Sequence, residues 1–494
     1  MNKDSIGRGV VYLYVEAITM LFSGYIYWLI LSKIIDPSSI GLASTIISFA
    51  TIVFSFASMG VAGGVQRYIA NGIAEKKYEQ VQGMINSSLL ITSVGVFISG
   101  IIILLFRGAI GTYFNIDFAY ILLSIALFVF LVFSALLRAI IIPSLKVKVI
   151  TIASVLSTLV KISFTLFLVF LGYGVYGIIF GFLTYPLLST LIFSFAINKK
   201  IYRIVPNLKV FISIKEILAA SITFWIPAII STVGSQLGTI TVFLVTGSGS
   251  AGIYFISFSI VSGILVMTSV LSSIAYPAIS TIKDGKKRAT WRLIKISLLL
   301  TIPISNILIF YPQAILSLFG SSYVLGYATL QILALTSLPT CISTGIGVLL
   351  YAYGDNRKFL LLGLSTSVPR VMLYFLFVPI FGGNGAALSF LIGSILGAII
   401  SLWYAKSIRI MLFYKQIFAL FVVPIIIAIP TTLFDINSIL SIIIILASSY
   451  VIFIALKLID PQDVEDILKI LPNRFASPIS NIMQKISKEK EKNN

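Results

Sequence analysis

The sequence predicts an all-α integral membrane protein with about fourteen transmembrane helices. Of its 494 residues, 59% are hydrophobic and only 10% are charged, whereas soluble domains carry roughly 25% charged residues. A water-soluble chain of this length has too little polar surface to cover so much apolar surface. The apolar residues recur in runs of about 20, the length of a membrane-spanning helix, rather than in the alternating segments of about 10 that a barrel uses.

Apolar runs separated by loop signals define the individual spans in order along the chain. They cover residues 10–32, 40–66, 84–106, 118–142, 150–171, 175–197, 218–246, 252–280, 293–318, 327–352, 359–381, 385–405, 417–434 and 438–458. No small-residue cleavage site follows the first run, so we expect it to remain as a span. Several outer loops are tight turns, too short to hold the substrate of an externally acting polymerase or glycosyltransferase.

The positive charges collect on one side of these spans. With the N-terminus inside, 29 of the 35 Lys and Arg residues fall in the N-terminal segment, the even-numbered loops and the tail, and only Lys33 and Arg107 fall in the opposite loops. This asymmetry predicts a cell-membrane protein whose N- and C-termini are both cytoplasmic. The net charge of +19 is thus explained by topology and by attraction to anionic membrane lipids, and no nucleic-acid partner is expected.

The residue inventory excludes several kinds of chemistry. The chain contains no histidine and a single cysteine, Cys341. A Ser-His-Asp triad, an imidazole metal site and a cysteine-ligated zinc or iron–sulfur site are therefore excluded. No phosphate-binding motif of the form G-x-x-x-x-G-K-[ST] occurs either. We therefore expect no enzymatic activity, no cofactor and no metal.

The chain resembles itself at an offset of about 210 residues. Four short matches occur in the same order in both halves: residues 39–41 with 250–252, 76–77 with 286–287, 156–158 with 364–366, and 174–177 with 382–385. Six spans in each half give parallel repeats, which implies two lobes related by an axis normal to the membrane. The predicted domains are lobes 1–216 and 217–416, a peripheral pair of spans at 417–458, and a cytoplasmic tail at 459–494 with amphipathic helices.

Besides Lys295 and Lys457, which are counted with the adjoining loop and tail, five charged residues fall inside or at the edge of the predicted spans, where charge is costly and normally faces a partner or an aqueous cavity. They are Glu16, Arg67, Arg138, Lys161 and Arg370. Lys161 and Arg370 lie near the midplane at positions of the repeat that agree to within one residue. Arg67 and Arg138 lie near the inner ends of their spans, where snorkelling to the headgroups is the alternative interpretation. Because only Glu16 is negative, the excess positive charge predicts an anionic cargo, with phosphate as the obvious candidate.

Several segments resemble the polysaccharide-type lipid-linked oligosaccharide flippases of the multidrug/oligosaccharidyl-lipid/polysaccharide exporter superfamily. The matching segments are residues 31–41 (LSKIIDPSSIG), Gly60, residues 66–68 (QRY), 251–254 (AGIY), 350–354 (LYAYG) and 379–387 (PIFGGNGAA). The resemblance covers about residues 5 to 410. It implies two six-helix bundles forming a V around a central cavity, with the last two spans peripheral.

The resemblance also implies a function, which is the flipping of a polyprenyl- or dolichyl-(pyro)phosphate-linked glycan to the outer face, in a pathway whose glycosyltransferases are possible partners. Lys161, Arg370, Arg67 and Arg138 are then the candidate substrate-binding cations, and Glu16 is a candidate coupling residue or charge partner.

One departure from the family concerns the seventh span, where many relatives carry Asp-Arg after a Gln. Here Gln236-Leu is followed by Gly238-Thr239. Because this charged pair could couple transport to an ion gradient, its absence leaves the energy source for transport open. The alternatives are a multidrug/cation antiporter of the same superfamily and, less favoured, a membrane enzyme or channel.

Overall fold

A computed structural model describes residues 16, 19, 22–144, 147–198, 214–282 and 284–459 of the chain. This described part is almost entirely helical and contains no β-strand, as the sequence predicts. Twelve of its helical segments are long and apolar enough to cross a membrane. The all-α, multi-pass membrane fold is therefore confirmed.

The described helices follow the predicted spans closely. The long helices are α2 (Pro37–Ala57), α3 (Val61–Ala74), α4 (Tyr78–Leu105), α6 (Phe118–Ile141), α7 (Val147–Phe170), α8 (Gly174–Ala196), α9 (Ile214–Thr246), α10 (Ser248–Thr281), α11 (Lys286–Phe310), α14 (Ser337–Ala352), α15 (Asn356–Ser407), α16 (Tyr414–Leu433) and α17 (Ser438–Ala455). Shorter helices are α5 (Arg107–Phe114), α12 (Pro312–Ser317) and α13 (Tyr327–Ala334).

The exact number of spans stays a prediction. Residues 22–34 are helical, and most of the rest of the expected first span lies outside the described residues. The 52-residue α15 covers two expected spans, and its backbone leaves the helical conformation at Gly382, where φ is 55° and ψ is −132°. The amphipathic helices expected in the tail lie outside the described residues beyond residue 459.

Three of the expected spans are each divided into two helices in the structure. The span expected at 40–66 is two helices, α2 and α3, because Gly60 takes a left-handed backbone conformation (φ 64°) between them. The span expected at 327–352 is likewise divided into α13 and α14 around residues 335–336. The span expected at 293–318 ends as a separate short helix, α12, because the backbone leaves the helical conformation at Tyr311 (φ −123°, ψ 44°). The short helix α5 is additional to the expected spans, since hydropathy alone does not separate a short surface helix from an apolar loop.

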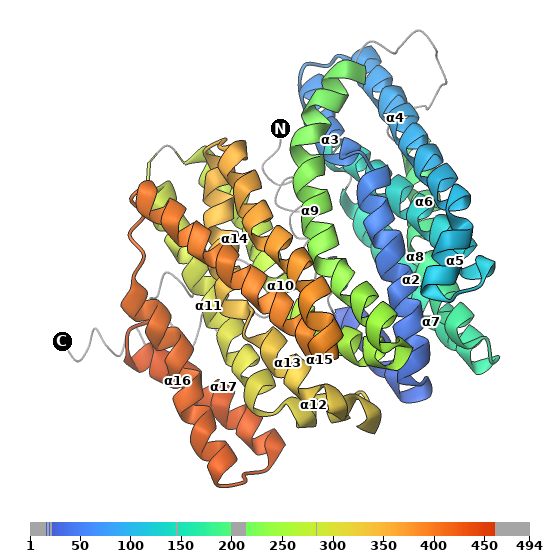
Figure 1. The fold of residues 1–494 in the computed structure, drawn as a ribbon. Helices are drawn as coiled ribbons and strands as arrows, with labels where there is room; N and C mark the ends of the chain where they lie inside the picture. Colours follow the sequence, from blue (N-terminus) through green and yellow to red (C-terminus); the bar gives the residue numbers. More distant parts are fainter. Residues whose placement is uncertain are drawn as a thin grey trace. The chain divides into compact units, whose positions relative to one another are not determined.

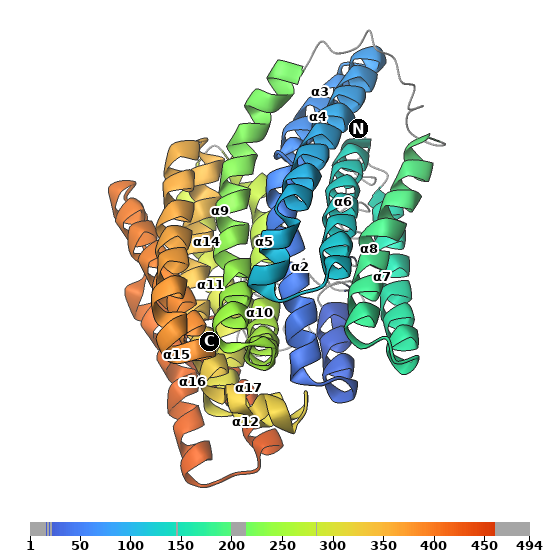
Figure 2. The ribbon, with the colours of Figure 1, turned by 45° about the vertical axis from the view of Figure 1, so that its right-hand side comes forward.

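The chain divides into two compact units. Unit 1 comprises Met1–Gly263, Pro312–Thr336 and Asp355–Ile400, and unit 2 comprises Ile264–Tyr311, Ser337–Gly354 and Ser401–Asn494. Within unit 1, α2 packs against α9, and α7 and α8 form a hairpin (Figure 2). Within unit 2, α11 packs against α14 and α16, and α16 and α17 form a second hairpin (Figure 1). The division into lobes 1–216 and 217–416 stays a prediction.

A local sequence signal explains where α2 begins. Asp36 caps the helix, because one carboxylate oxygen accepts a hydrogen bond from the backbone N–H of Ser39 at 3.1 Å and the other accepts one from the Ser39 hydroxyl at 2.8 Å. Pro37 occupies the first turn, where a missing N–H costs nothing. This cap sets the start of the helix that carries Gly41.

Gly41 of α2 and Gly252 of α10, which match each other in the repeat, meet at a helix crossing in unit 1. A Cβ atom added to Gly41 would lie 2.7 Å from the backbone nitrogen of Gly252, and one added to Gly252 would lie 3.0 Å from the backbone nitrogen of Gly41. Two backbones therefore touch here with no room for a side chain, as expected for small residues at membrane helix interfaces.

The predicted topology can be tested by cysteine labelling. Gly249 has open space around its Cβ position, and the native Cys341 is buried. In intact cells, a membrane-impermeant maleimide should label Gly249→Cys and leave the native chain unlabelled. Lys287→Cys should react only after permeabilisation, and its labelling in intact cells would overturn the predicted orientation.

Candidate functional site

Lys161 lies on α7 between two aromatic rings. Its Nζ atom is 4.2 Å from the ring centroid of Tyr27 and 4.2 Å from that of Phe182 on α8. Tyr27 is 1% exposed, and its hydroxyl donates to the carbonyl of Ile178 at 3.4 Å. Each cation–π contact contributes about 0.5–2 kcal/mol. Because the rings are neutral, they stabilise the ammonium without cancelling its charge.

Arg370 lies on α15 in a similar environment. It is 7% exposed, and its Cζ atom is 3.5 Å from the ring centroid of Phe390. One terminal nitrogen donates to the Ser394 hydroxyl at 3.0 Å, whereas Nε is buried without a partner. Gly393 provides the space, since a Cβ there would lie 2.9 Å from the Arg370 Cβ and 3.3 Å from Nε.

Lys161 and Arg370 are linked by a run of aromatic contacts within unit 1. The ring-centroid distances are 4.9 Å for Tyr27–Trp28, 4.8 Å for Trp28–Phe255, 6.0 Å for Tyr254–Phe258 and 5.3 Å for Phe258–Phe390. Tyr254 and Phe255 are neighbours on α10, so this run leads from one cation to the other. The two positions that are equivalent in the repeat thus belong to one compact unit.

Neither of these cations is neutralised within the described part of the chain. Ion pairs in that part join other cations to carboxylates, among them Lys77 to Glu75, Arg138 to Glu16, and Lys358 to Asp355. Taking a single cation to the centre of a membrane helix costs about 2.5–3.5 kcal/mol on insertion scales. Aromatic contacts offset part of that cost, and no described carboxylate cancels the charge of either residue.

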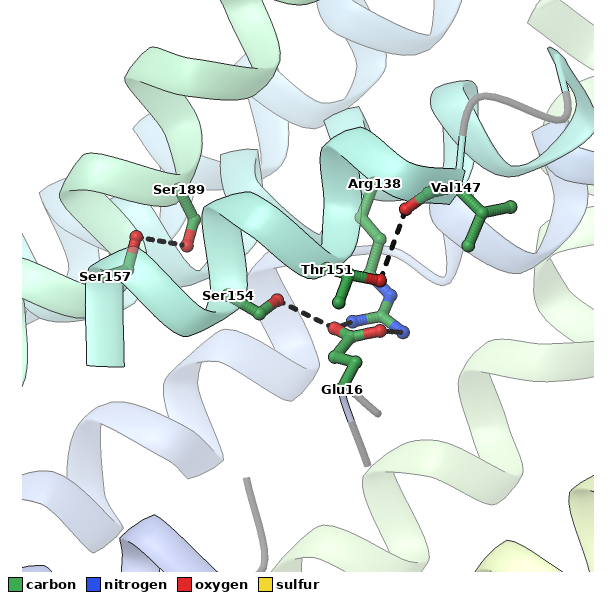
Figure 3. Close-up of polar contacts among 7 residues, drawn as sticks. All are labelled: Glu16, Arg138, Val147, Thr151, Ser154, Ser157 and Ser189. Carbon is green, nitrogen blue, oxygen red and sulfur yellow. Dashed lines mark hydrogen bonds and ion pairs between the residues drawn. The ribbon is translucent and has the colours of Figure 1, made fainter. Parts of the chain in front are cut away.

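Glu16 and Arg138 form a partly buried ion pair instead (Figure 3). The pair is bidentate, with Arg138 Nη2 donating to Glu16 Oε2 at 3.0 Å. Ser154 on α7 donates its hydroxyl to Glu16 Oε1 at 2.8 Å. Glu16 therefore ties the first span to α6 and α7. Since the charge of Arg138 is already paired, an anion could bind it only if the pair opened, and its substrate-binding role stays a prediction.

The two members of this pair differ in burial, which predicts an asymmetric mutational effect. Glu16 is 2% exposed, whereas the Arg138 side chain is 35% exposed. Arg138→Met leaves a buried unpaired carboxylate and should lower the free energy of unfolding by about 3–5 kcal/mol. Glu16→Gln leaves the Arg138 cation, which can reach water, so this substitution should lower the free energy of unfolding by a smaller amount. Thermal unfolding in detergent measures both, and a double Glu16→Gln, Arg138→Met variant less stable than Arg138→Met alone would contradict this account.

The remaining candidate, Arg67, lies on α3, and its side chain is outside the described part of the structure. Sequence reasoning missed the aromatic partners Tyr27, Phe182 and Phe390 and the hydroxyl of Ser394. The Gly393-xxx-Gly397 spacing was a usable signal, because small residues one turn apart mark a place where another group approaches the helix. Here Thr366 approaches both glycines, and Arg370 approaches Gly393.

Comparisons with known proteins agree with this architecture. A family model described as "Polysaccharide biosynthesis protein" matches residues 30–325. An uncharacterized membrane protein in the cps region of Klebsiella pneumoniae is 24% identical over 400 residues, covering 79% of this chain and 80% of that protein.

Solved structures share the fold. The lipid II flippase MurJ, in an inward closed conformation, has a TM-score of 0.69 at 18% identity and covers 89% of this chain and 98% of its own. An inward-facing multidrug resistance MATE family transporter of the MOP superfamily has a TM-score of 0.65 at 18% identity. The match covers 83% of this chain and 98% of the transporter.

Proposed function

Since the chain belongs to the polysaccharide biosynthesis protein family, we propose that it flips a lipid-(pyro)phosphate-linked oligosaccharide from the cytoplasmic to the outer face of the cell membrane. The carrier lipid is a polyprenyl or dolichyl chain, and the glycan serves polysaccharide or glycoprotein synthesis. Glycosyltransferases of the same pathway are the proposed partners. The resemblance to the MOP superfamily that the sequence predicts is confirmed by this family match and the shared fold.

The observation that carries the proposal is the pair of cations without a described counter-charge, the partly buried Lys161 and the buried Arg370. Arginine presents a planar fork that matches phosphate oxygens, and lysine adds a point charge. The buried Nε of Arg370 lacks an acceptor, which a phosphate oxygen would supply. A pyrophosphate carries enough negative charge to balance both residues, whereas a neutral glycan would leave them uncompensated.

The transport step is alternating access between the predicted lobes 1–216 and 217–416. The charged headgroup and glycan pass between the lobes while the polyprenyl tail stays in the bilayer. The chain has no P-loop motif in its sequence, so this step proceeds without ATP hydrolysis by this protein. We expect the purified protein to lack ATPase activity.

The second candidate is a multidrug/cation antiporter of the same superfamily. Such a protein needs an acidic residue in the lobes to trade a cationic drug for an ion. Glu16 is the acidic residue that lies well inside a predicted span, and it is engaged by Arg138 and Ser154. This engagement favours the flippase over the antiporter.

A reconstituted transport assay separates the two candidates. Proteoliposomes containing the full chain are supplied with a fluorescent lipid-pyrophosphate-linked oligosaccharide, or with a cationic dye and an ion gradient. The proposal expects the labelled lipid to change leaflets and the dye to remain where it was added. Dye movement without lipid movement would replace the flippase assignment with the antiporter.

A further inference from the structure

Unit 2 contains its own concentration of positive charge, made of residues other than Lys161 and Arg370, which belong to unit 1. A cavity of about 930 Å³ lies there, and six cations line it. They are Lys286, Lys287, Arg288, Arg292, Lys295 and Arg409, and we call this cavity the basic pocket. One carboxylate, Asp284, also lines it. The predicted topology places the basic pocket at the cytoplasmic membrane surface.

The backbone adds to the attraction for an anion. Most of the cations come from the start of α11, whose N-cap residue Gly285 has φ of 94° and provides no side-chain cap. The first N–H groups of a helix point outward with a partial positive charge. Lys295 lies deeper on the same helix and is only 3% exposed. The cations therefore extend from the surface into the interior of the pocket.

The rim of the basic pocket is apolar and exposed. Met411 is 81% exposed, Phe413 49% and Tyr353 47%. The Phe413 ring stands 5.3 Å from the ring of Trp291, which also lines the cavity. Cations beside exposed aromatic and aliphatic side chains match a lipid, whose headgroup is charged and whose chains are apolar. A soluble nucleotide or pyrophosphate uses the cations but leaves this rim unoccupied.

Gln416 supplies a further requirement for the ligand. It lines the basic pocket, and its Oε1 atom is buried without a hydrogen-bond partner. A buried acceptor left without a donor is costly. A lipid phosphodiester whose headgroup carries a hydroxyl can donate to this atom, whereas a phosphodiester such as phosphatidylcholine, whose headgroup has no O–H or N–H group, cannot.

We propose that the basic pocket binds the headgroup of an anionic, hydroxyl-bearing phospholipid of the cytoplasmic leaflet, such as phosphatidylglycerol. The phosphate lies among the lysine and arginine side chains, the hydroxyl donates to Gln416, and the acyl chains pass over the apolar rim. This site is additional to the proposed glycan-lipid site, because its residues all belong to unit 2.

Tryptophan fluorescence reports binding directly, since Trp291 lines the pocket. The full chain in a neutral detergent is titrated with acyl-brominated phosphatidylglycerol or acyl-brominated phosphatidylcholine, and the quenching that disappears in Trp291→Phe is assigned to Trp291. The proposal expects phosphatidylglycerol to bind at least about tenfold more tightly than phosphatidylcholine, because each nearby cation strengthens attraction to an anionic headgroup. This preference should weaken in 0.5 M salt, where the Debye length falls below about 5 Å.

A charge-matched pair of variants locates the site. The triple variant Arg288→Gln, Arg292→Gln, Arg409→Gln removes three pocket cations and leaves the buried Lys295 in place. The control variant Lys76→Gln, Lys77→Gln, Lys148→Gln removes three exposed cations of unit 1. The lipid preference should be lost in the triple variant and kept in the control, with thermal unfolding confirming that both are folded.

Three results would overturn the proposal. Equal quenching of Trp291 by the two lipids would remove the charge selectivity, and an unchanged preference in the triple variant would place the lipid elsewhere. Displacement of a fluorescent nucleoside diphosphate by pyrophosphate, without quenching by either brominated lipid, would identify a soluble phosphate ligand instead. None of these measurements involves glycan transport, so failure here and failure of the proposed flippase are distinguishable.

Discussion

Replacing Lys161 and Arg370 together by methionine is expected to abolish glycan export while the protein stays at normal abundance in the membrane. If these cations bind the pyrophosphate, their loss leaves a buried anion without counter-charge. Truncating one partner of a buried charge pair costs about 2–5 kcal/mol, so the loss of both corresponds to far more than a hundredfold in transport. Complementation of a strain that lacks its own flippase, with the membrane level of each variant measured in parallel, checks the result.

Folding should survive this substitution for a physical reason. Methionine is apolar, and its sulfur makes favourable contacts with aromatic rings. At position 161 it would remain between Tyr27 and Phe182, and at position 370 it would lie over Phe390. Removing an unpaired charge from the membrane interior relieves desolvation rather than adding to it.

A conservative variant, a control variant and a variant with a smaller expected effect make the export assay more specific. Arg370→Lys keeps a charge but loses the bidentate fork, so partial export is expected. Lys148→Met, Lys406→Met removes two exposed cations of the predicted cytoplasmic side and should leave export unchanged. Arg67→Met should reduce export more weakly, if Arg67 captures the headgroup at the inner mouth. Full export by the Lys161→Met, Arg370→Met variant at normal abundance would refute the cationic-site mechanism.

The membrane fold was predictable from the sequence because hydropathy over a 20-residue window reports a one-dimensional property of the chain. Span ends such as Phe118 and Ser438 coincide with the expected ones. The break at Gly60 was not predicted, because a single glycine inside an apolar run is usually compatible with a continuous helix. The short helix α5 was missed for a related reason, since eight residues carry too little periodicity to be recognised.

The candidate site was predictable only in part. Lys161 and Arg370 stood out because charge within a span is costly, and that cost does not depend on knowing the fold. Their aromatic partners did not stand out, since 13% of all residues are Phe, Trp or Tyr and no pattern marks which of them face a cation. Glu16 and Arg138 are 122 residues apart, and their pairing depends on helix packing that the sequence does not reveal.

A side chain introduced at Gly41 is expected to reduce transport by about a hundredfold without unfolding the protein. The Cβ of a leucine would overlap the carbonyl of Ser248 and lie 2.7 Å from the backbone nitrogen of Gly252. Backbone atoms cannot rotate away as a flexible side chain can, so the crossing of α2 and α10 would have to separate. Overpacking of this kind costs about 1–3 kcal/mol, and the upper end corresponds to roughly two orders of magnitude in an equilibrium.

We expect the energetic cost of this overlap to fall only on the conformation in which α2 and α10 are in contact. The predicted topology places Gly41 and Gly252 near the outer ends of their helices, so we expect this crossing to close the outer side of the protein. A flippase must form and break that closure in every cycle, and Gly41→Leu destabilises the closed state alone. Gly252→Leu should have the same effect, because the two glycines meet across the crossing.

Gly263→Leu, on the same helix α10 but with open space around its Cβ position, is the matched control. Measured by the same complementation, normal export by Gly41→Leu would mean that the crossing need not close tightly during transport, whereas loss of export by Gly263→Leu would mean that leucine harms α10 wherever it is placed.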